Sequence, residues 1–99
     1  MYVVVRTDLS LPQQLVQAAH AAHESGLLAE PGAEPSSLIA CQVPDRQTLE
    51  ATLARSSVKV PCVPFYEPDD DAGLTAFATV PLNTEQRKIF SNLKLWRPQ

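Results

Sequence analysis

The sequence predicts an α/β domain with a mixed four-stranded sheet and helices packed on its faces, in the order β-α-β-α-β-β-α. Short apolar runs rich in β-branched residues alternate with segments whose apolar residues recur at helical spacing. Strands and helices that alternate in this way form a sheet covered by helices. With 99 residues and 44% hydrophobic content, the chain is predicted to form a single domain over residues 1–99.

The first half of the chain contains two predicted strands and the first predicted helix. Residues 2–6 form an apolar run typical of a strand buried on both faces, and we predict that it is the central strand. A helix is predicted to follow, because Ser10 can cap it, Pro12 is tolerated in the first turn and Gln13 completes a capping box. Its predicted buried stripe is Leu11, Leu15, Ala18, Ala19 and Ala22. Residues 38–43 are the second predicted strand.

The second half is predicted to contain a helix, two strands and a final helix. Asp45 is expected to cap a helix that ends near Arg55. Residues 58–65 read as a strand whose two prolines remove ladder donors, which favours an edge position. Residues 75–80 form the next strand, and the short connection between the two predicts an antiparallel pair. Asn83 begins a capping pattern for the last helix.

Charge and composition restrict the possible partners. A net charge of −3 argues against a protein that grips nucleic acid over its whole surface, because phosphates must be met by clustered Lys and Arg. Half of the eight basic residues fall in the last thirteen positions: Arg87, Lys88, Lys94 and Arg97. This cluster predicts either a local phosphate-facing patch or an ordinary solvated surface.

The sequence predicts a cytoplasmic protein without a membrane anchor. Its apolar runs are far shorter than the roughly 20 residues that span a bilayer. Met1 is followed directly by a predicted strand, without the charged region of a secretion signal. Cys41 and Cys62 lie in apolar segments without CxxC spacing, which indicates reduced, buried thiols.

Metal and phosphate-loop sites are not expected. His20 and His23 are one helical turn apart, but no third ligand accompanies them. Instead of binding a metal, His20 is expected to pack or hydrogen-bond at the edge of the helix, and His23 is expected to be solvated. The acidic run at residues 69–71 is more typical of a solvated loop than of a cation site. Three glycines in the whole chain cannot supply a glycine-rich phosphate loop.

Four short motifs carry a family resemblance. Residues 3–9 form an apolar strand that ends in R-x-D-L, and residues 17–21 read Q-x-x-H-A. Residues 71–75 read D-A-G-x-T, and residues 93–96 read L-K-L followed by an aromatic residue. In this order the motifs resemble those of the type 2 peptidyl-tRNA hydrolases. The resemblance implies that family's mixed four-stranded fold and hydrolysis of the ester that joins a peptide or N-acyl-amino acid to tRNA, without a metal or organic cofactor.

The resemblance also implies roles for individual residues. His20 and Asp8 are expected to line or support the site, and Asp71 is expected to position water or a partner group. Thr75 is expected to hydrogen-bond the substrate. The expected catalytic residues are therefore His20, Asp71 and Thr75. The expected substrate-binding residues are Arg6, Asp8, Gln13, Arg87, Lys88 and Lys94.

One stretch departs from the family. Between the first two motifs, the family has a glycine- and lysine-rich loop whose lysine is assigned to catalysis, whereas residues 10–14 contain neither residue type. Gln13 or Gln14 could donate a hydrogen bond there but cannot supply a positive charge. Three hypotheses follow. They are an active hydrolase in which Lys94 or Lys88 replaces the lysine, a non-catalytic relative that binds RNA, a nucleotide or a protein, and a structural homodimer. The expected partners are tRNA and a second copy of the chain.

Overall fold

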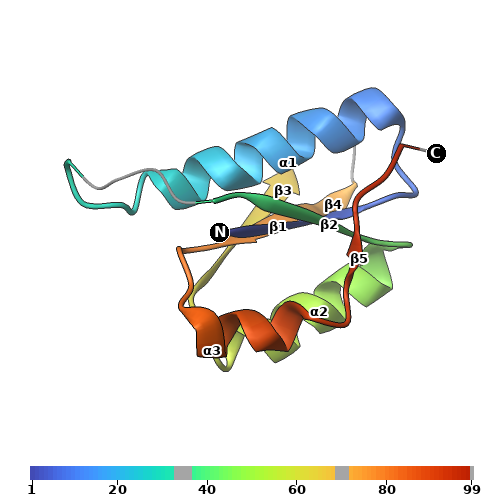
Figure 1. The fold of residues 1–99 in the computed structure, drawn as a ribbon. Helices are drawn as coiled ribbons and strands as arrows, with labels where there is room; N and C mark the ends of the chain where they lie inside the picture. The colour runs from blue at the N-terminus through green and yellow to red at the C-terminus, as the bar shows by residue number, and fades with distance from the viewer. Residues whose placement is uncertain (33–36, 69–71, 99) are drawn as a thin grey trace.

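The computed structural model describes residues 1–32, 37–68 and 72–98. Its elements are β1 (Tyr2–Arg6), α1 (Leu11–Gly26), β2 (Ile39–Val43), α2 (Arg46–Ser57), β3 (Cys62–Glu67), β4 (Gly73–Thr79), α3 (Thr84–Arg87), the 3₁₀ turn η1 (Lys88–Phe90) and β5 (Lys94–Leu95). A five-stranded mixed sheet forms the middle layer, with α1 on one face and α2 and α3 on the other (Figure 1). The predicted α/β class and mixed sheet are confirmed.

Strand β1 lies at the centre of the sheet, whose strand order is β3-β4-β1-β2-β5. Val4 is opposite Cys41 in the parallel neighbour β2 and opposite Phe77 in the antiparallel neighbour β4. Val3 and Val5 are each 2% exposed and Val4 is fully buried, because both faces of the strand are covered. The predicted central position of this strand is therefore confirmed.

Strand β3 lies at an edge, as predicted, but it covers Cys62–Glu67 rather than residues 58–65, so only one of the two prolines lies within it. It pairs antiparallel with β4 alone, and Pro64 within it has no N–H to offer a further strand. The ladder is irregular between Phe65 and Tyr66, close to where the chain leaves the sheet. The antiparallel pairing predicted for these two strands is confirmed.

The predicted strand count was wrong, because a fifth strand closes the other edge. β5 pairs antiparallel with β2 through Leu95 opposite Cys41 and Lys94 opposite Gln42. A segment of two residues shows no alternation that sequence patterns could detect, and its backbone pairing with β2 defines it. The final helix is also shorter than predicted: Asn83 caps α3 as expected, but η1 follows after four residues.

The predicted buried stripe of α1 is confirmed only in part. Ala18 and Ala22 are partly buried against the core beneath the helix, whereas Leu15 is 71% exposed, Leu11 is 39% exposed and Ala19 also faces solvent. The residues that α1 buries are Gln14, Gln17, Ala21 and Ser25. The polar members of this set are tolerated because each is hydrogen-bonded, as Ser25 Oγ is to the Thr79 carbonyl at 2.8 Å. Among the described parts of the chain, no helix has the length and apolar character needed to cross a membrane.

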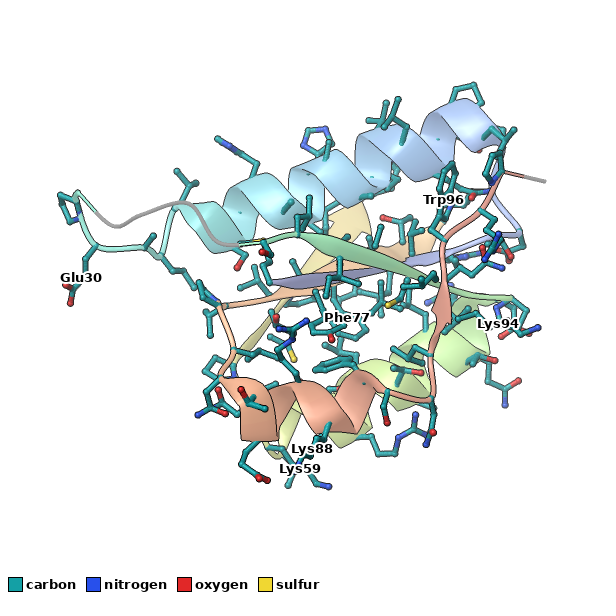
Figure 2. The ribbon with its side chains drawn as sticks, in the orientation of Figure 1. Glu30, Lys59, Phe77, Lys88, Lys94 and Trp96 are labelled. Carbon is teal, nitrogen blue, oxygen red and sulfur yellow. The ribbon has the colours of Figure 1, made fainter. Side chains whose placement is uncertain are left out.

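Successive side chains of the central strands point to opposite faces of the sheet, so the core consists of two layers. Val4 and Phe77 point toward α2, where they pack with Leu49 (Figure 2). Val3 and Val5 point toward α1 and pack with Ala21. The layer beneath α1 consists mostly of alanine and valine, so this helix lies close to the sheet.

Replacing Phe77 with alanine should be strongly destabilising. Phe77 is fully buried at the centre of the α2 layer, and truncating such a ring costs roughly 3–5 kcal/mol. Val58→Ala is the matched control, because Val58 is 85% exposed and its truncation should cost less than about 0.5 kcal/mol. Urea unfolding measures both. Equal midpoints for the two variants would contradict the packing of Phe77.

Candidate functional site

The first and third motif segments meet at the carboxyl end of β1. Arg6 is the last residue of β1, and its Nη1 donates hydrogen bonds to the Ala72 carbonyl at 2.6 Å and to the Leu74 carbonyl at 3.1 Å. The antiparallel pairing of β1 with β4 brings the end of one strand beside the start of the other. The R-x-D-L and D-A-G-x-T segments are therefore adjacent in space.

Arg6 is also paired with Asp8. The guanidinium forms a two-pronged contact, with Nε to Oδ1 at 2.7 Å and Nη2 to Oδ2 at 2.8 Å. The hydrogen bond to Asp8 raises the pKa of Arg6 above its ordinary value, so the group stays charged. Because the residue is only 9% exposed and makes four hydrogen bonds, it mainly holds this end of the sheet together.

The second and third motif segments are joined by Gln17. Its Nε2 donates to Glu67 Oε2 at 2.7 Å, and its Oε1 accepts from Thr75 Oγ1 at 2.8 Å. An ionised carboxylate only accepts, so the amide nitrogen must face Glu67 and the amide oxygen must face Thr75. The Thr75 hydroxyl therefore donates its hydrogen bond to Gln17, and the Phe65 carbonyl at 3.2 Å is a second acceptor. At 1% exposure, Thr75 orients Gln17 rather than presenting a donor to solvent.

His20 lies one turn after Gln17 on α1 and is exposed. Its imidazole stacks on the Phe65 ring, with centroids 4.5 Å apart and an angle of 2° between the planes. The same helix and strand thus make two contacts, since Gln17 also binds Glu67. The stack fixes the plane of the imidazole and leaves its edge open to solvent. His20 also lines a hollow of about 380 Å³ on the outer side of α1, together with His23.

Gln13 is used in the cap of α1. Its Oε1 accepts from the Ser10 backbone N–H at 3.1 Å and from Ser10 Oγ at 3.0 Å, while the Gln13 N–H donates to Ser10 Oγ. The predicted capping box is confirmed. The amide oxygen of Gln13 is therefore used by the helix cap, and Gln13 takes no part in the hydrogen bonds that join Gln17 to Glu67 and Thr75.

Gln14 links the loop after β1 to the C-terminal segment. Its Nε2 donates to the Leu9 carbonyl at 2.7 Å and to the Thr7 carbonyl at 3.3 Å. Its Oε1 accepts from Trp96 Nε1 at 2.8 Å. The buried Gln14 amide thus fixes the loop that carries Asp8, and it ties Trp96 to the start of α1 (Figure 2).

Lys94 lies at the same end of the sheet as Asp8 but on the β5 edge. It lines an open hollow of about 400 Å³ with Thr7, Gln42 and Pro44. Thr7 directly follows β1, which places the Lys94 hollow at the carboxyl ends of the two parallel strands. Ligands of open α/β sheets often bind at this end.

Of the other C-terminal basic residues, Arg97 lines a hollow together with Lys94, whereas Arg87 and Lys88 do not. Arg87 lines a separate hollow with Met1, at the opposite end of β1 from Thr7. Lys88 forms an exposed ion pair with Glu85 at 3.0 Å and lies beside α3, away from Lys94 (Figure 2). The structure therefore separates Lys94 from Arg87 and Lys88, the other two C-terminal cations that were predicted to bind substrate.

Two further predicted features can be placed in part. Asp71 lies outside the described residues. Cys41 and Cys62 are free thiols; Cys41 is buried as predicted and Cys62 is half-buried, and burial raises the pKa of each, which favours the protonated form. Within residues 1–32, 37–68 and 72–98, no three His, Cys, Asp or Glu side chains are grouped closely enough to hold a metal ion.

Sequence patterns did not reveal the residues that connect the motifs. Gln14, Gln17 and Glu67 make these connections. Gln14 was considered only as a neutral donor in place of the lysine and Gln17 only as the first residue of the Q-x-x-H-A motif, and none of the three was predicted as a site residue. The signal in the sequence is that Gln14, Gln17 and His20 follow one another at intervals of one helical turn.

The fold and the site define an α/β domain with a hydrogen-bonded polar cluster between α1, β3 and the start of β4. The sequence matches no protein-family model and no curated protein.

The bond between Thr75 and Gln17 can be tested by unfolding. Thr75→Val keeps the shape of the side chain but leaves the buried Gln17 oxygen without its donor, which should lower the free energy of unfolding by roughly 1–3 kcal/mol. Thr75→Ser keeps the hydroxyl and should cost less. Urea titrations of both variants, alone and combined with Gln17→Leu, should show a less than additive loss for Thr75→Val. Full additivity would show that the two side chains do not interact.

Proposed function

We propose that this domain hydrolyses the ester bond of peptidyl-tRNA or N-acyl-aminoacyl-tRNA, the activity of the family that its motifs resemble. The observation that carries the proposal is the meeting of three motif segments far apart in the sequence. Arg6 binds the carbonyls of Ala72 and Leu74, and Thr75 binds Gln17. Residues that share an active site must meet in this way, whereas an accidental likeness of motifs does not require it.

The proposed chemistry needs a base for water and donors for the developing oxyanion. In this proposal, His20 accepts a proton from the attacking water and returns it to the tRNA oxygen when the ester C–O bond breaks. Its fixed ring plane and exposed edge suit that role. Asp71 positions the water, and Thr75 acts as a positioning residue through Gln17. Lys94 contacts a phosphate of the tRNA.

The test is release of N-acetyl-amino acid from N-acetyl-aminoacyl-tRNA by the purified protein. His20→Ala should lower the rate roughly 100-fold or more, because a positioned acid–base group contributes about that factor. His23→Ala is the matched control, since His23 is exposed on the same helix and should be dispensable. Asp71→Asn should also abolish release.

Two results would refute the hydrolase proposal or its base. Release no faster than in a blank without protein would reject the activity. Equal rates for the His20→Ala and His23→Ala variants would reject the role of His20.

A second candidate function is favoured by the separation of His20 and Lys94. His20 stacks on β3 and Lys94 belongs to β5, which are the two edges of the sheet, and the two residues line different hollows. We propose as the alternative a non-catalytic relative that binds RNA, a nucleotide or a protein. In either case, the exposed Leu11, Leu15 and Val16 of α1 support association of two copies.

Salt-dependent tRNA binding tests the alternative. Lys94→Gln should weaken binding and reduce the slope of log K against log salt by about 0.9, the value for one lost phosphate contact on a duplex, or by about 0.7 on a single strand. Arg87→Gln and Lys88→Gln report on the other two predicted contacts. Arg55→Gln, on the exposed surface of α2, is the control for loss of one charge. Binding that responds equally to Lys94→Gln and Arg55→Gln would reject a specific contact at Lys94.

A further inference from the structure

An apolar cavity lies between α1 and the β2 side of the sheet, away from the His20 site. It measures about 110 Å³. Val3, Val5 and Ala40 form its sheet side, Ala18 comes from α1, and Trp96 covers it from the C-terminal segment (Figure 2). Leu15 also lines the cavity and is 71% exposed, and Ala40 is exposed as well, so the cavity is open to solvent along this side.

Small side chains leave this space empty. Ala18 and Ala40 face it from opposite sides, and the longer Leu15 points largely to solvent. Trp96 cannot collapse into the space, because its backbone N–H donates to the Ala40 carbonyl at 2.9 Å and its Nε1 donates to Gln14 at 2.8 Å. Packed interiors contain few voids larger than a water molecule, so an apolar hollow of this size loses dispersion contacts that a ligand can restore.

The lining gives water little to bind. Gln14 is the only polar side chain among the lining residues apart from the Trp96 N–H, and these two groups bond to each other. Both N–H groups of the Gln14 amide are used by the carbonyls of Thr7 and Leu9. Water against this lining therefore forms few hydrogen bonds to the protein, and an apolar group displaces it at little cost.

We infer that this cavity binds one small, uncharged apolar group, namely a branched aliphatic group or a single benzene ring. An engineered apolar cavity of about 150 Å³ accepts benzene, and the present cavity is slightly smaller but open at Leu15. No described charged side chain lines it, so a carboxylate or an ammonium group on the buried part of the ligand is excluded. The inference is independent of ester hydrolysis, because the cavity and His20 lie on different flanks of α1.

The only tryptophan of the chain reports on the cavity directly. Titration with benzene or 3-methyl-1-butanol should give a saturable change in Trp96 emission and raise the midpoint of thermal unfolding. Glycerol has hydroxyl groups without an apolar body and should produce neither change. A non-saturating, linear response to all three compounds would overturn the inference.

The same alanine-to-leucine substitution at two neighbouring residues of α1 gives a matched pair. Ala18→Leu should fill the cavity and weaken binding of either probe roughly tenfold or more, whereas Ala19→Leu, on the solvent side, should leave it unchanged. If circular dichroism shows that the Ala18→Leu protein is unfolded, Ala40→Ile fills the same space from β2. Equal affinities for the filled and control variants would overturn the inference.

Sedimentation separates a small ligand from a second copy as the occupant. If dimerisation alone changes Trp96 emission and abolishes the response to both probes, a side chain of the partner copy fills the cavity and the inference fails. A saturable response in protein that sediments as a monomer supports it.

Discussion

The arrangement of the polar cluster depends on one buried cation. An arginine side chain that is only 11% exposed is stable in a fold when its charge and its donors are matched, and Asp8 with two backbone carbonyls supplies this match. Removing one partner of a fully buried pair costs about 3–5 kcal/mol, and the 38% exposure of the Asp8 side chain reduces that figure here. The same bonds fix the loop after β1 against the start of β4. The position of Thr75, one residue beyond Leu74, follows from them.

The strands and helix starts could be predicted from the sequence, because local patterns determine them. The valines of β1 predict a strand buried on both faces, and Pro64 predicts the edge. The face that α1 buries was not predictable from hydrophobicity, because hydrogen bonds decide it. Gln14 and Gln17 each form hydrogen bonds with distant segments. Burying an amide whose hydrogen bonds are satisfied costs little free energy, so a hydrophobicity pattern alone does not identify the buried face. The leucines of the helix are displaced to its surface as a result.

The residues of the candidate site could be predicted only where they belong to a recognisable sequence motif. Arg6 and Thr75 come from recognisable motifs and lie in the cluster. Glu67 carries no motif, and its place depends on the pairing of β3 with β4 and on the position of α1 over both. For the basic residues, closeness in the sequence wrongly suggested closeness in space. Lys88 and Lys94 are close in sequence, yet η1 and β5 place them on different parts of the surface. Proximity in the sequence does not make a patch when the chain changes direction between the residues.

The loop before α1 limits which donors can stabilise a developing negative charge at this site. Ser10 caps the helix directly, and Gln13 Oε1 is used by that cap, so the residues in place of the family's lysine loop offer only neutral groups. Losing a preorganised cationic donor typically costs a factor of about 10²–10³ in rate. Lys94 and His20 lie near opposite edges of the sheet, since β5 and β3 are four strand spacings, roughly 19 Å, apart. The hydrogen bond from Trp96 to Gln14 brings the C-terminal segment against the start of α1. An ester at His20 and a phosphate at Lys94 are still compatible with one extended tRNA end crossing the first turns of α1. In the proposed complex, Lys94 would contact a phosphate, and the donors of the loop before α1 would all be neutral.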